Sequence, residues 1–106
     1  MTLHDFDELF QKMINEEILM MHKKGPDYTR NSPDKLANFK RSAEEIGIKS
    51  EQVLYVLIKK HWDAVITYIK TGKLSGEPIE SKILDIRNYL ALLRALVEEK
   101  KTRKDI

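Results

Sequence analysis

The chain has no cysteine, only four glycines and three prolines among its 106 residues, and no apolar run close to the length of a membrane span. Without cysteine, disulfide bonds, thiolate metal sites and a cysteine nucleophile are excluded. A membrane-spanning helix needs about 20 consecutive apolar residues. The acidic start, MTLHDFDELF, also lacks the basic and then apolar layout of a signal peptide. These absences predict a cytoplasmic protein that does not enter a membrane.

A strong charge of one sign is also missing. The chain carries 19 basic and 17 acidic residues, a net charge of +2. Proteins that bind nucleic acid usually concentrate basic side chains on one face, so this balance does not favour that function. The 42% of hydrophobic residues can supply a core, and the 34% of charged residues keeps the surface polar. We expect one folded domain over residues 1–99 and a charged, frayed tail over residues 100–106.

Helix-capping and helix-breaking residues divide the chain into four helical segments, and no strand-like alternation competes with them. Gly25-Pro26 is predicted to end the first segment, and a loop follows over residues 27–31. Ser32-Pro33 predicts the start of a second, shorter helix, because proline at the first helical position needs no partner for its nitrogen. The four segments run from Thr2 to about Lys24, from Ser32 to Gly47, from Ser50 to about Thr71, and from Pro78 to Glu99.

The last segment has the most regular apolar pattern. Its apolar residues recur in alternating steps of four and three: Ile79, Ile83, Ile86, Leu90, Leu93 and Val97. This spacing keeps one seam of a helix facing a partner helix, as in bundles and coiled coils. We therefore expect an all-α, four-helix bundle-like domain with three long helices and one short one. A second copy of the chain is expected to complete it as a homodimer.

Polar residues interrupt the apolar rows of the third and fourth segments. His61 falls between Ile58 and Val65, while Asp85 and Asn88 lie one turn apart beside the seam. Such side chains need partners, because an unsatisfied buried polar group costs about 1–3 kcal/mol. One interpretation is a ligand or metal site built from facing helices. The other is a hydrogen-bonded core histidine and a solvated polar edge.

Carboxylates on the first segment offer a second candidate site. Glu16 and Glu17 are predicted to face inward, where a third carboxylate, from Asp85 or Glu77, could join them. Carboxylates from neighbouring helices can hold a divalent cation such as Mg²⁺. Paired glutamates are also common on ordinary helices, so both interpretations stay open.

Basic residues surround the start of the second segment, where a helix N-terminus could receive an anion at Ser32 beside Arg30. The basic residues are Lys23, Lys24, Arg30, Lys35, Lys40 and Arg41. Phosphate binding is one hypothesis for this region, and an exposed basic surface is the alternative.

Four short motifs together resemble the phage family called nucleotide modification associated domain 1. They are K-K-G-P-D-Y-T from Lys23 to Thr29, N-F-K-R from Asn38 to Arg41, K-H-W-D-A from Lys60 to Ala64, and E-P-I-E-S-K-I-L-D-I-R-N-Y from Glu77 to Tyr89. The resemblance extends from about Phe6 to Glu98. It implies a protein of bacteriophages or related elements, in the host cytoplasm, with a role in nucleotide or modified-base metabolism.

The last motif is also similar to the MazG-like and dimeric dUTPase-like nucleotide pyrophosphatases, which are all-α and magnesium-dependent. That similarity implies a metal site formed by Glu17 (or Glu16), Glu77 and Asp85, with Asp85 as the catalytic candidate. It also implies phosphate contacts from lysines and base stacking on Tyr28, Phe39 or Trp62. The resulting ligand-binding candidates are Lys24, Asp27, Tyr28, Arg30, Asn38, Lys40, Lys60, His61 and Asn88.

The chain departs from the pyrophosphatase pattern at two positions. Those enzymes usually carry an E-x-x-E pair on the first helix, whereas Glu16 and Glu17 are adjacent. Ser81 stands where related sequences often have an acid one turn before the last aspartate. The first functional hypothesis is therefore a nucleotide binder, in modified-nucleotide metabolism or in sequestering a nucleotide signal. The alternatives are a magnesium-dependent nucleoside triphosphate pyrophosphatase and a helical protein–protein adaptor.

Overall fold

The computed structural model describes residues 1–29 and 32–104, with side chains described for residues 1–24 and 32–102. Four helices account for most of this part of the chain, which contains no strand. They are α1 (Leu3–Thr29), α2 (Ala37–Ile46), α3 (Ser50–Thr71) and α4 (Ile79–Lys104). The predicted all-α fold with three long helices and one short helix is confirmed. In this part of the chain no helix combines the length and hydrophobicity that a bilayer span requires.

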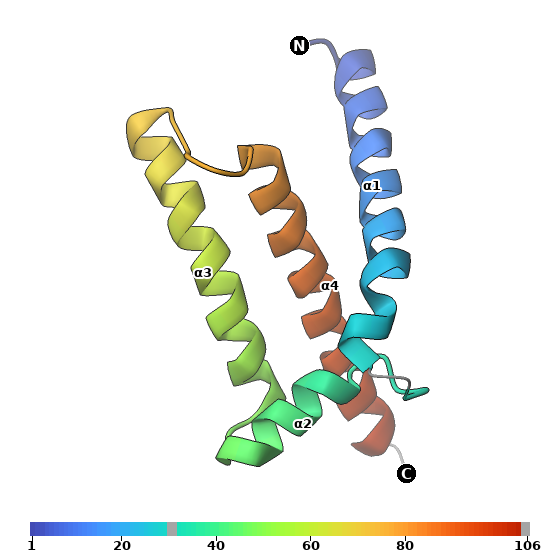
Figure 1. Ribbon diagram of the computed structural model, residues 1–106. Helices are drawn as coiled ribbons and strands as arrows, with labels where there is room; N and C mark the ends of the chain where they lie inside the picture. Colours follow the sequence, from blue (N-terminus) through green and yellow to red (C-terminus); the bar gives the residue numbers. More distant parts are fainter. Residues whose placement is uncertain (30–31, 105–106) are drawn as a thin grey trace.

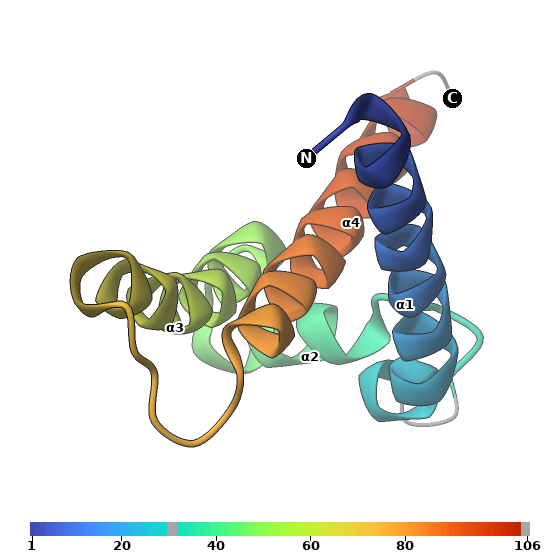
Figure 2. The ribbon, with the colours of Figure 1, turned by 90° about the horizontal axis from the view of Figure 1, so that it is seen from above.

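Helix α4 lies between α1 and α3, and the short α2 crosses one end of the assembly (Figure 1). Contacts join α3 with α4, α2 with α3, α1 with α4, and α1 with α2, but none joins α1 with α3 within the described residues. Seen from above, the three long helices are splayed rather than closed into a square bundle (Figure 2). The radius of gyration is 16.0 Å, against about 13 Å for a compact domain of this length. The bundle is therefore open on the side between α1 and α3.

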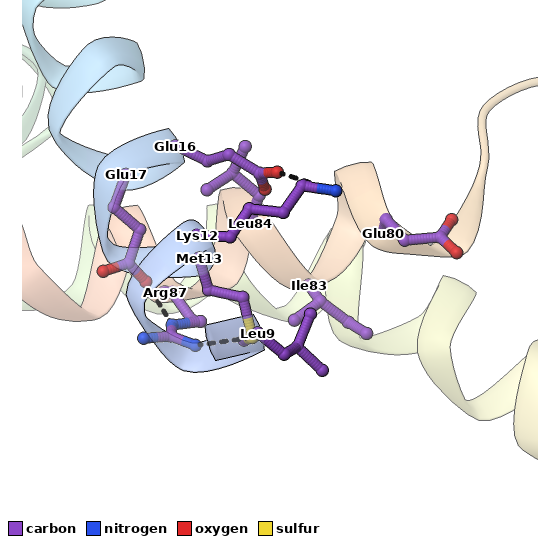
Figure 3. A pocket seen from close by; sticks show the side chains of 9 residues that line it. All are labelled: Leu9, Lys12, Met13, Glu16, Glu17, Glu80, Ile83, Leu84 and Arg87. Carbon is purple, nitrogen blue, oxygen red and sulfur yellow. Dashed lines mark hydrogen bonds and ion pairs between the residues drawn. The ribbon is translucent and has the colours of Figure 1, made fainter. Parts of the chain in front are cut away.

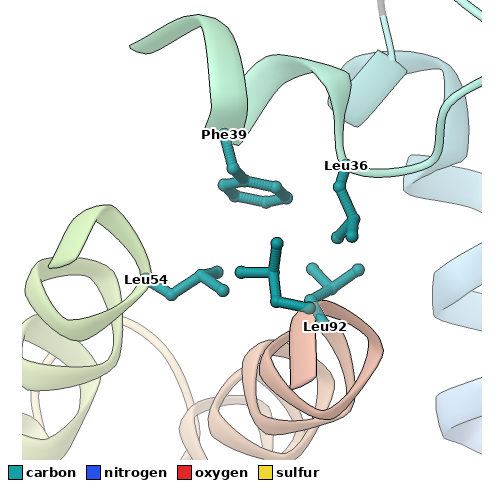
Figure 4. Packing of buried hydrophobic residues seen from close by; sticks show 5 residues of the cluster. Leu36, Phe39, Leu54 and Leu92 are labelled. Carbon is teal, nitrogen blue, oxygen red and sulfur yellow. The ribbon is translucent and has the colours of Figure 1, made fainter. Parts of the chain in front are cut away.

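The core lies where α2 meets α3 and α4. Leu36 and Phe39 point from the α2 region toward Leu54 of α3 and Leu92 of α4 (Figure 4). Leu96 completes the buried cluster. Burying a side chain of this size contributes about 1.5–3 kcal/mol, so this small cluster holds three helices together. Phe39 is a core residue here, which corrects the expectation that its ring is available to stack on a base.

The side of α4 that faces the core differs from the predicted seam. The buried residues are Asn88, Leu92 and Leu96, which follow one another in steps of four. The seam residues Ile83 and Leu90, in contrast, are exposed. Helix α4 is thus rotated so that the row of Asn88, Leu92 and Leu96 faces the core. Half of the predicted apolar seam faces outward.

Helix α2 begins later than the sequence predicted. The Ser32 hydroxyl accepts a hydrogen bond from the amide of Asp34, and Asp34 Oδ1 accepts one from the amide of Leu36. These short-range bonds form turns, since serine and aspartate side chains compete with the helix for backbone donors. The helix therefore starts at Ala37. Ser32 does not open a helix, so the expected anion site at a helix N-terminus there is wrong.

Three other boundaries also differ from expectation. Helix α1 passes through Gly25-Pro26 and ends at Thr29, although an interior proline removes one helical hydrogen bond and usually kinks or breaks a helix. Helix α3 takes Lys49 as its N-terminal cap, and the Gln52 side chain accepts a hydrogen bond from the Lys49 amide. Helix α4 continues to Lys104, past the predicted end at Glu99.

Candidate functional site

Four of the predicted site residues meet between three helices. The Asp85 carboxylate of α4 lies 3.6 Å from Nζ of Lys24 on α1 and 3.6 Å from Nδ1 of His61 on α3. Asn88 follows Asp85 by three residues on α4, on the side that packs into the core. Residues far apart in sequence thus form one polar group, which we call the Asp85 cluster: Lys24, His61, Asp85 and Asn88. Asp85 and His61 lie side by side, whereas neither pocket found in the described residues brings His61, Asp85 and Asn88 together in one concavity.

Asn88 is the most unusual member of the Asp85 cluster. Its side chain is only 2% exposed, and neither its amide nitrogen nor its amide oxygen has a hydrogen-bond partner in the described part of the chain. Each buried polar group left without a partner costs about 1–3 kcal/mol. An apolar side chain at this position would avoid that cost. The chain therefore keeps a donor and an acceptor together inside the protein at the expense of stability.

His61 has a similar environment. Its Nδ1 is buried and makes no hydrogen bond within the described residues, because the nearest carboxylate oxygen is 3.6 Å away. Burial lowers the pKa of His61, and the negative charge of Asp85 offsets this only in part. The imidazole is therefore neutral near pH 7, since its pKa lies below the ordinary value of about 6.5. Neutral imidazole offers one donor and one acceptor.

An aromatic ring covers one side of His61. The rings of His61 and Tyr89 are stacked, with centroids 5.7 Å apart. Burial raises the pKa of the Tyr89 hydroxyl, and the nearby Asp85 carboxylate raises it further. Tyr89 is therefore protonated at neutral pH and can donate a hydrogen bond. Tyr89 was not among the predicted site residues, although it lies one turn after Asp85 in the same motif.

Lysines set the charge around the Asp85 cluster. Lys60 and Lys82 lie within electrostatic reach of His61, as does Glu77. Glu77 is itself 3.2 Å from Nζ of Lys82. With Lys24 included, three cations surround two carboxylates, which gives the region a small positive charge that suits an anionic ligand.

The carboxylates expected to hold a metal lie apart. Glu17 forms an ion pair with Arg87, and Glu77 pairs with Lys82. Glu77 also lies before the start of α4 at Ile79, and so is not on the helix that carries Asp85. Among the residues that the structure describes, no three histidine, aspartate or glutamate side chains form a group for one ion. The donor set does not fit a three-carboxylate magnesium site, and no reaction step can be derived through one here.

A pocket of about 460 Å³ lies between α1 and α4 (Figure 3). Leu9, Met13 and Ile83 give it an apolar floor, and charged side chains surround them. Arg87 crosses one end, where it pairs with Glu17 and places its guanidinium 5.4 Å from the centroid of the Phe10 ring. This pocket could not be predicted from the sequence, because its walls come from two helices, and residue spacing does not show how two helices lie relative to each other.

A second, more open pocket of about 310 Å³ lies further along α1 and α4 and includes Lys24 in its lining. Neither of these two pockets is lined by His61, Asp85 or Asn88. Lys24 is the most exposed charged member of the Asp85 cluster, with 40% of its side chain exposed, against 14% for Asp85 and 13% for His61.

The remaining predicted ligand-binding residues are not members of the Asp85 cluster. Lys40 pairs with Asp34 and Glu99 at the α2 end of the molecule. Lys60 is exposed on α3, and Asn38 is half-buried on α2. The side chains of Asp27, Tyr28 and Arg30 are outside the described residues, so these predictions stay predictions. Trp62 is 47% exposed and lines neither pocket.

Comparison with known proteins finds no matching family model, no matching curated protein and no matching solved structure. A function for the chain therefore has to be argued from its own residues.

Proposed function

We propose that the chain binds a phosphorylated small molecule at the Asp85 cluster, and that this ligand is a nucleotide, as the sequence resemblance implies. The observation that carries the proposal is the set of buried, unpartnered polar atoms on His61 and Asn88. Unpartnered groups of this kind are rare in folded proteins and call for an explanation. A bound ligand that hydrogen-bonds to them would supply one.

Each member of the cluster has a distinct task in such a complex. The Asn88 amide offers a donor beside an acceptor, which matches the paired groups on the edge of a nucleobase. The Lys24 ammonium attracts phosphate. Its 3.6 Å separation from Asp85 exceeds the about 2.7–2.9 Å of a charge-assisted hydrogen bond. Lys24 is therefore loosely held and can exchange the Asp85 carboxylate for a phosphate.

The arrangement favours binding over hydrolysis. Metal-assisted attack on a triphosphate needs several carboxylates around one ion. Here Glu17 and Glu77 are each engaged with a cation of α4, Arg87 and Lys82. Asp85 is the one carboxylate of the cluster, so a reversible binder requires fewer rearrangements than a pyrophosphatase.

A thermal-shift screen against canonical, modified and cyclic nucleotides, with and without Mg²⁺, tests the proposal, because a ligand specific for the folded state raises the melting temperature. Lys24→Met should weaken binding of the best nucleotide at least tenfold, as measured by calorimetry. Lys12→Met is the matched control, since Lys12 is exposed on the same helix and its ion pair is with Glu16 one turn later, at 3.9 Å. The Lys12→Met protein should bind like the wild type.

Three results would contradict the proposal. One is that no nucleotide stabilises the protein, which would favour the helical adaptor. Another is equal weakening by both lysine substitutions. The third is recovery of monophosphate, in place of intact nucleotide, from the heat-denatured complex. If Asp85→Asn then abolished that turnover, the pyrophosphatase alternative would replace the binder.

A further inference from the structure

Two apolar rows meet at the pocket between α1 and α4. On α1, Phe6 and Phe10 are exposed and stacked, with centroids 6.0 Å apart, and Leu9 lies beside them. On α4, Ile83 lines the same pocket as Leu9 (Figure 3). We call the combined area the α1–α4 surface: Phe6, Leu9, Phe10, Ile83, Leu90 and Val97. It is separate from the core, which lies on the opposite side of α4 around Leu92.

The α4 part of this surface has the spacing of a helix–helix interface. Ile83, Leu90 and Val97 recur every seven residues and are 41%, 48% and 40% exposed. A seven-residue apolar repeat keeps one line of a helix against a partner helix over its whole length. Within the described residues, neighbouring helices leave much of this line uncovered. The repeat therefore indicates a helical partner outside the single chain.

The surface area of the chain indicates how large that partner contact is. The accessible surface is 7909 Å², against about 6,100 Å² for a compact monomer of 12.4 kDa. The excess is about 1,800 Å², and permanent homodimers bury about 1,000–2,500 Å² on each subunit. The excess accessible surface of one chain is thus as large as the area that each subunit of a stable homodimer buries.

We propose that a second copy of this chain covers the α1–α4 surface, with the outward seams of the two α4 helices facing each other across a two-fold axis. Such an interface must be self-complementary, because the same patch is used on both subunits. The rim of the pocket meets this requirement with charges of both signs, Lys12 on α1 and Glu80 on α4. A two-fold arrangement can bring the cationic edge of one copy to the acidic edge of the other.

A competing surface lies on the outer side of α3. Tyr55, Trp62 and Ile69 also recur every seven residues and are exposed. This row stands on one helix alone, whereas the α1–α4 surface joins two helices around a pocket. The α1–α4 surface is therefore the better candidate for the excess accessible area, and the α3 row supplies a matched control.

Sedimentation equilibrium on the full chain tests the proposal. The wild type should be a dimer, and Leu90→Glu should be a monomer with unchanged helical content, because Leu90 is already half-exposed in the single chain. Leu90→Met should keep the dimer. Ile69→Glu, the same kind of change on α3, should also leave the dimer intact.

A monomeric wild type at every concentration would overturn the proposal. Dissociation by Ile69→Glu, whatever the effect of Leu90→Glu, would overturn the location of the interface. If Leu90→Glu does not fold, Val97→Glu replaces it, and an unchanged dimer constant for that variant would also count against the interface. These measurements need no nucleotide, so their outcome is independent of the proposed ligand.

Discussion

Single polar residues inside apolar rows carry the functional argument for this protein. Asn88 and His61 occupy positions where leucine or phenylalanine would pack without cost, and both retain buried atoms with no hydrogen-bond partner in the described residues. The same two positions stood out in the sequence, because each interrupts an apolar row. At this scale, a break in the hydrophobic pattern indicated where polar side chains lie inside the protein. It did not indicate whether those side chains would find hydrogen-bond partners.

Replacing Asn88 by leucine should separate stability from binding. Asn88→Leu removes two unpartnered polar atoms and keeps a similar volume, so we expect the free energy of unfolding to rise by about 1–3 kcal/mol. The same change should abolish the thermal shift caused by nucleotide. Urea unfolding and the nucleotide screen measure the two effects. A marked loss of stability would show that Asn88 is satisfied in solution.

His61 should make stability depend on pH. Burial holds its pKa in the folded protein below the ordinary value, so the unfolded chain takes up a proton at higher pH than the folded chain does. The free energy of unfolding should therefore fall as the pH decreases from about 7.5 to about 5.5, through the ordinary histidine pKa of about 6.5. His61→Gln should reduce this fall, as followed by urea unfolding at both pH values.

The control for the histidine experiment is His4→Gln. His4 lies at the exposed start of α1, where it pairs with Glu8. Its substitution should leave the pH dependence close to that of the wild type. Equal pH dependence in His61→Gln and the wild type would show that another group causes the effect.

At the scale of elements, Lys40 joins the short helix α2 to the C-terminal part of α4. Nζ of Lys40 on α2 lies 2.6 Å from Oδ2 of Asp34 and 2.8 Å from Oε1 of Glu99 on α4. Burial alone would lower the pKa of Lys40, but the hydrogen bonds to Asp34 and Glu99 outweigh burial and raise it. The ion pairs of Lys40 thus join a turn, α2 and the last turns of α4.

Removing this contact should cost more than removing an ion pair within one helix. Lys40→Ala should lower the free energy of unfolding by about 1 kcal/mol, the upper end for partly exposed pairs. Lys59→Ala breaks the pair with Asp63 on the same helix, and should cost less, because that pair is exposed and joins no second element. Denaturant unfolding of both variants provides the comparison. Equal costs would show that Lys40 does not join the two helices.

Helix boundaries show what sequence patterns could and could not predict at this scale. The end of α3 and the start of α4 followed from Gly72 and Pro78. Glycine readily takes the left-handed conformation that ends a helix, as Gly72 does with φ 72°, and proline fixes its own φ near the helical value. The start of α2 was misplaced by about four residues. There the Ser32 and Asp34 side chains bind backbone amides, and that competition depends on local geometry which residue types alone do not specify.

At the scale of the whole molecule, the open arrangement predicts that stability depends on protein concentration. If folding and dimer formation are coupled, the melting temperature of the wild type should rise with concentration by mass action. The melting temperature of Leu90→Glu should be nearly constant over the same range. Scanning calorimetry at several concentrations measures both, and a constant wild-type melting temperature would indicate a chain that is stable alone.

The sequence by itself determined the all-α fold, the number of helices and the positions of the unusual polar residues, because helix periodicity and capping act over a few neighbouring residues. Only the tertiary structure decided which row of α4 faces the core, since two rows compete and the outcome depends on α2 and α3. It also decided that Glu17 pairs with Arg87. Side chains on different helices meet or miss according to how the helices cross, and no local pattern contains that information.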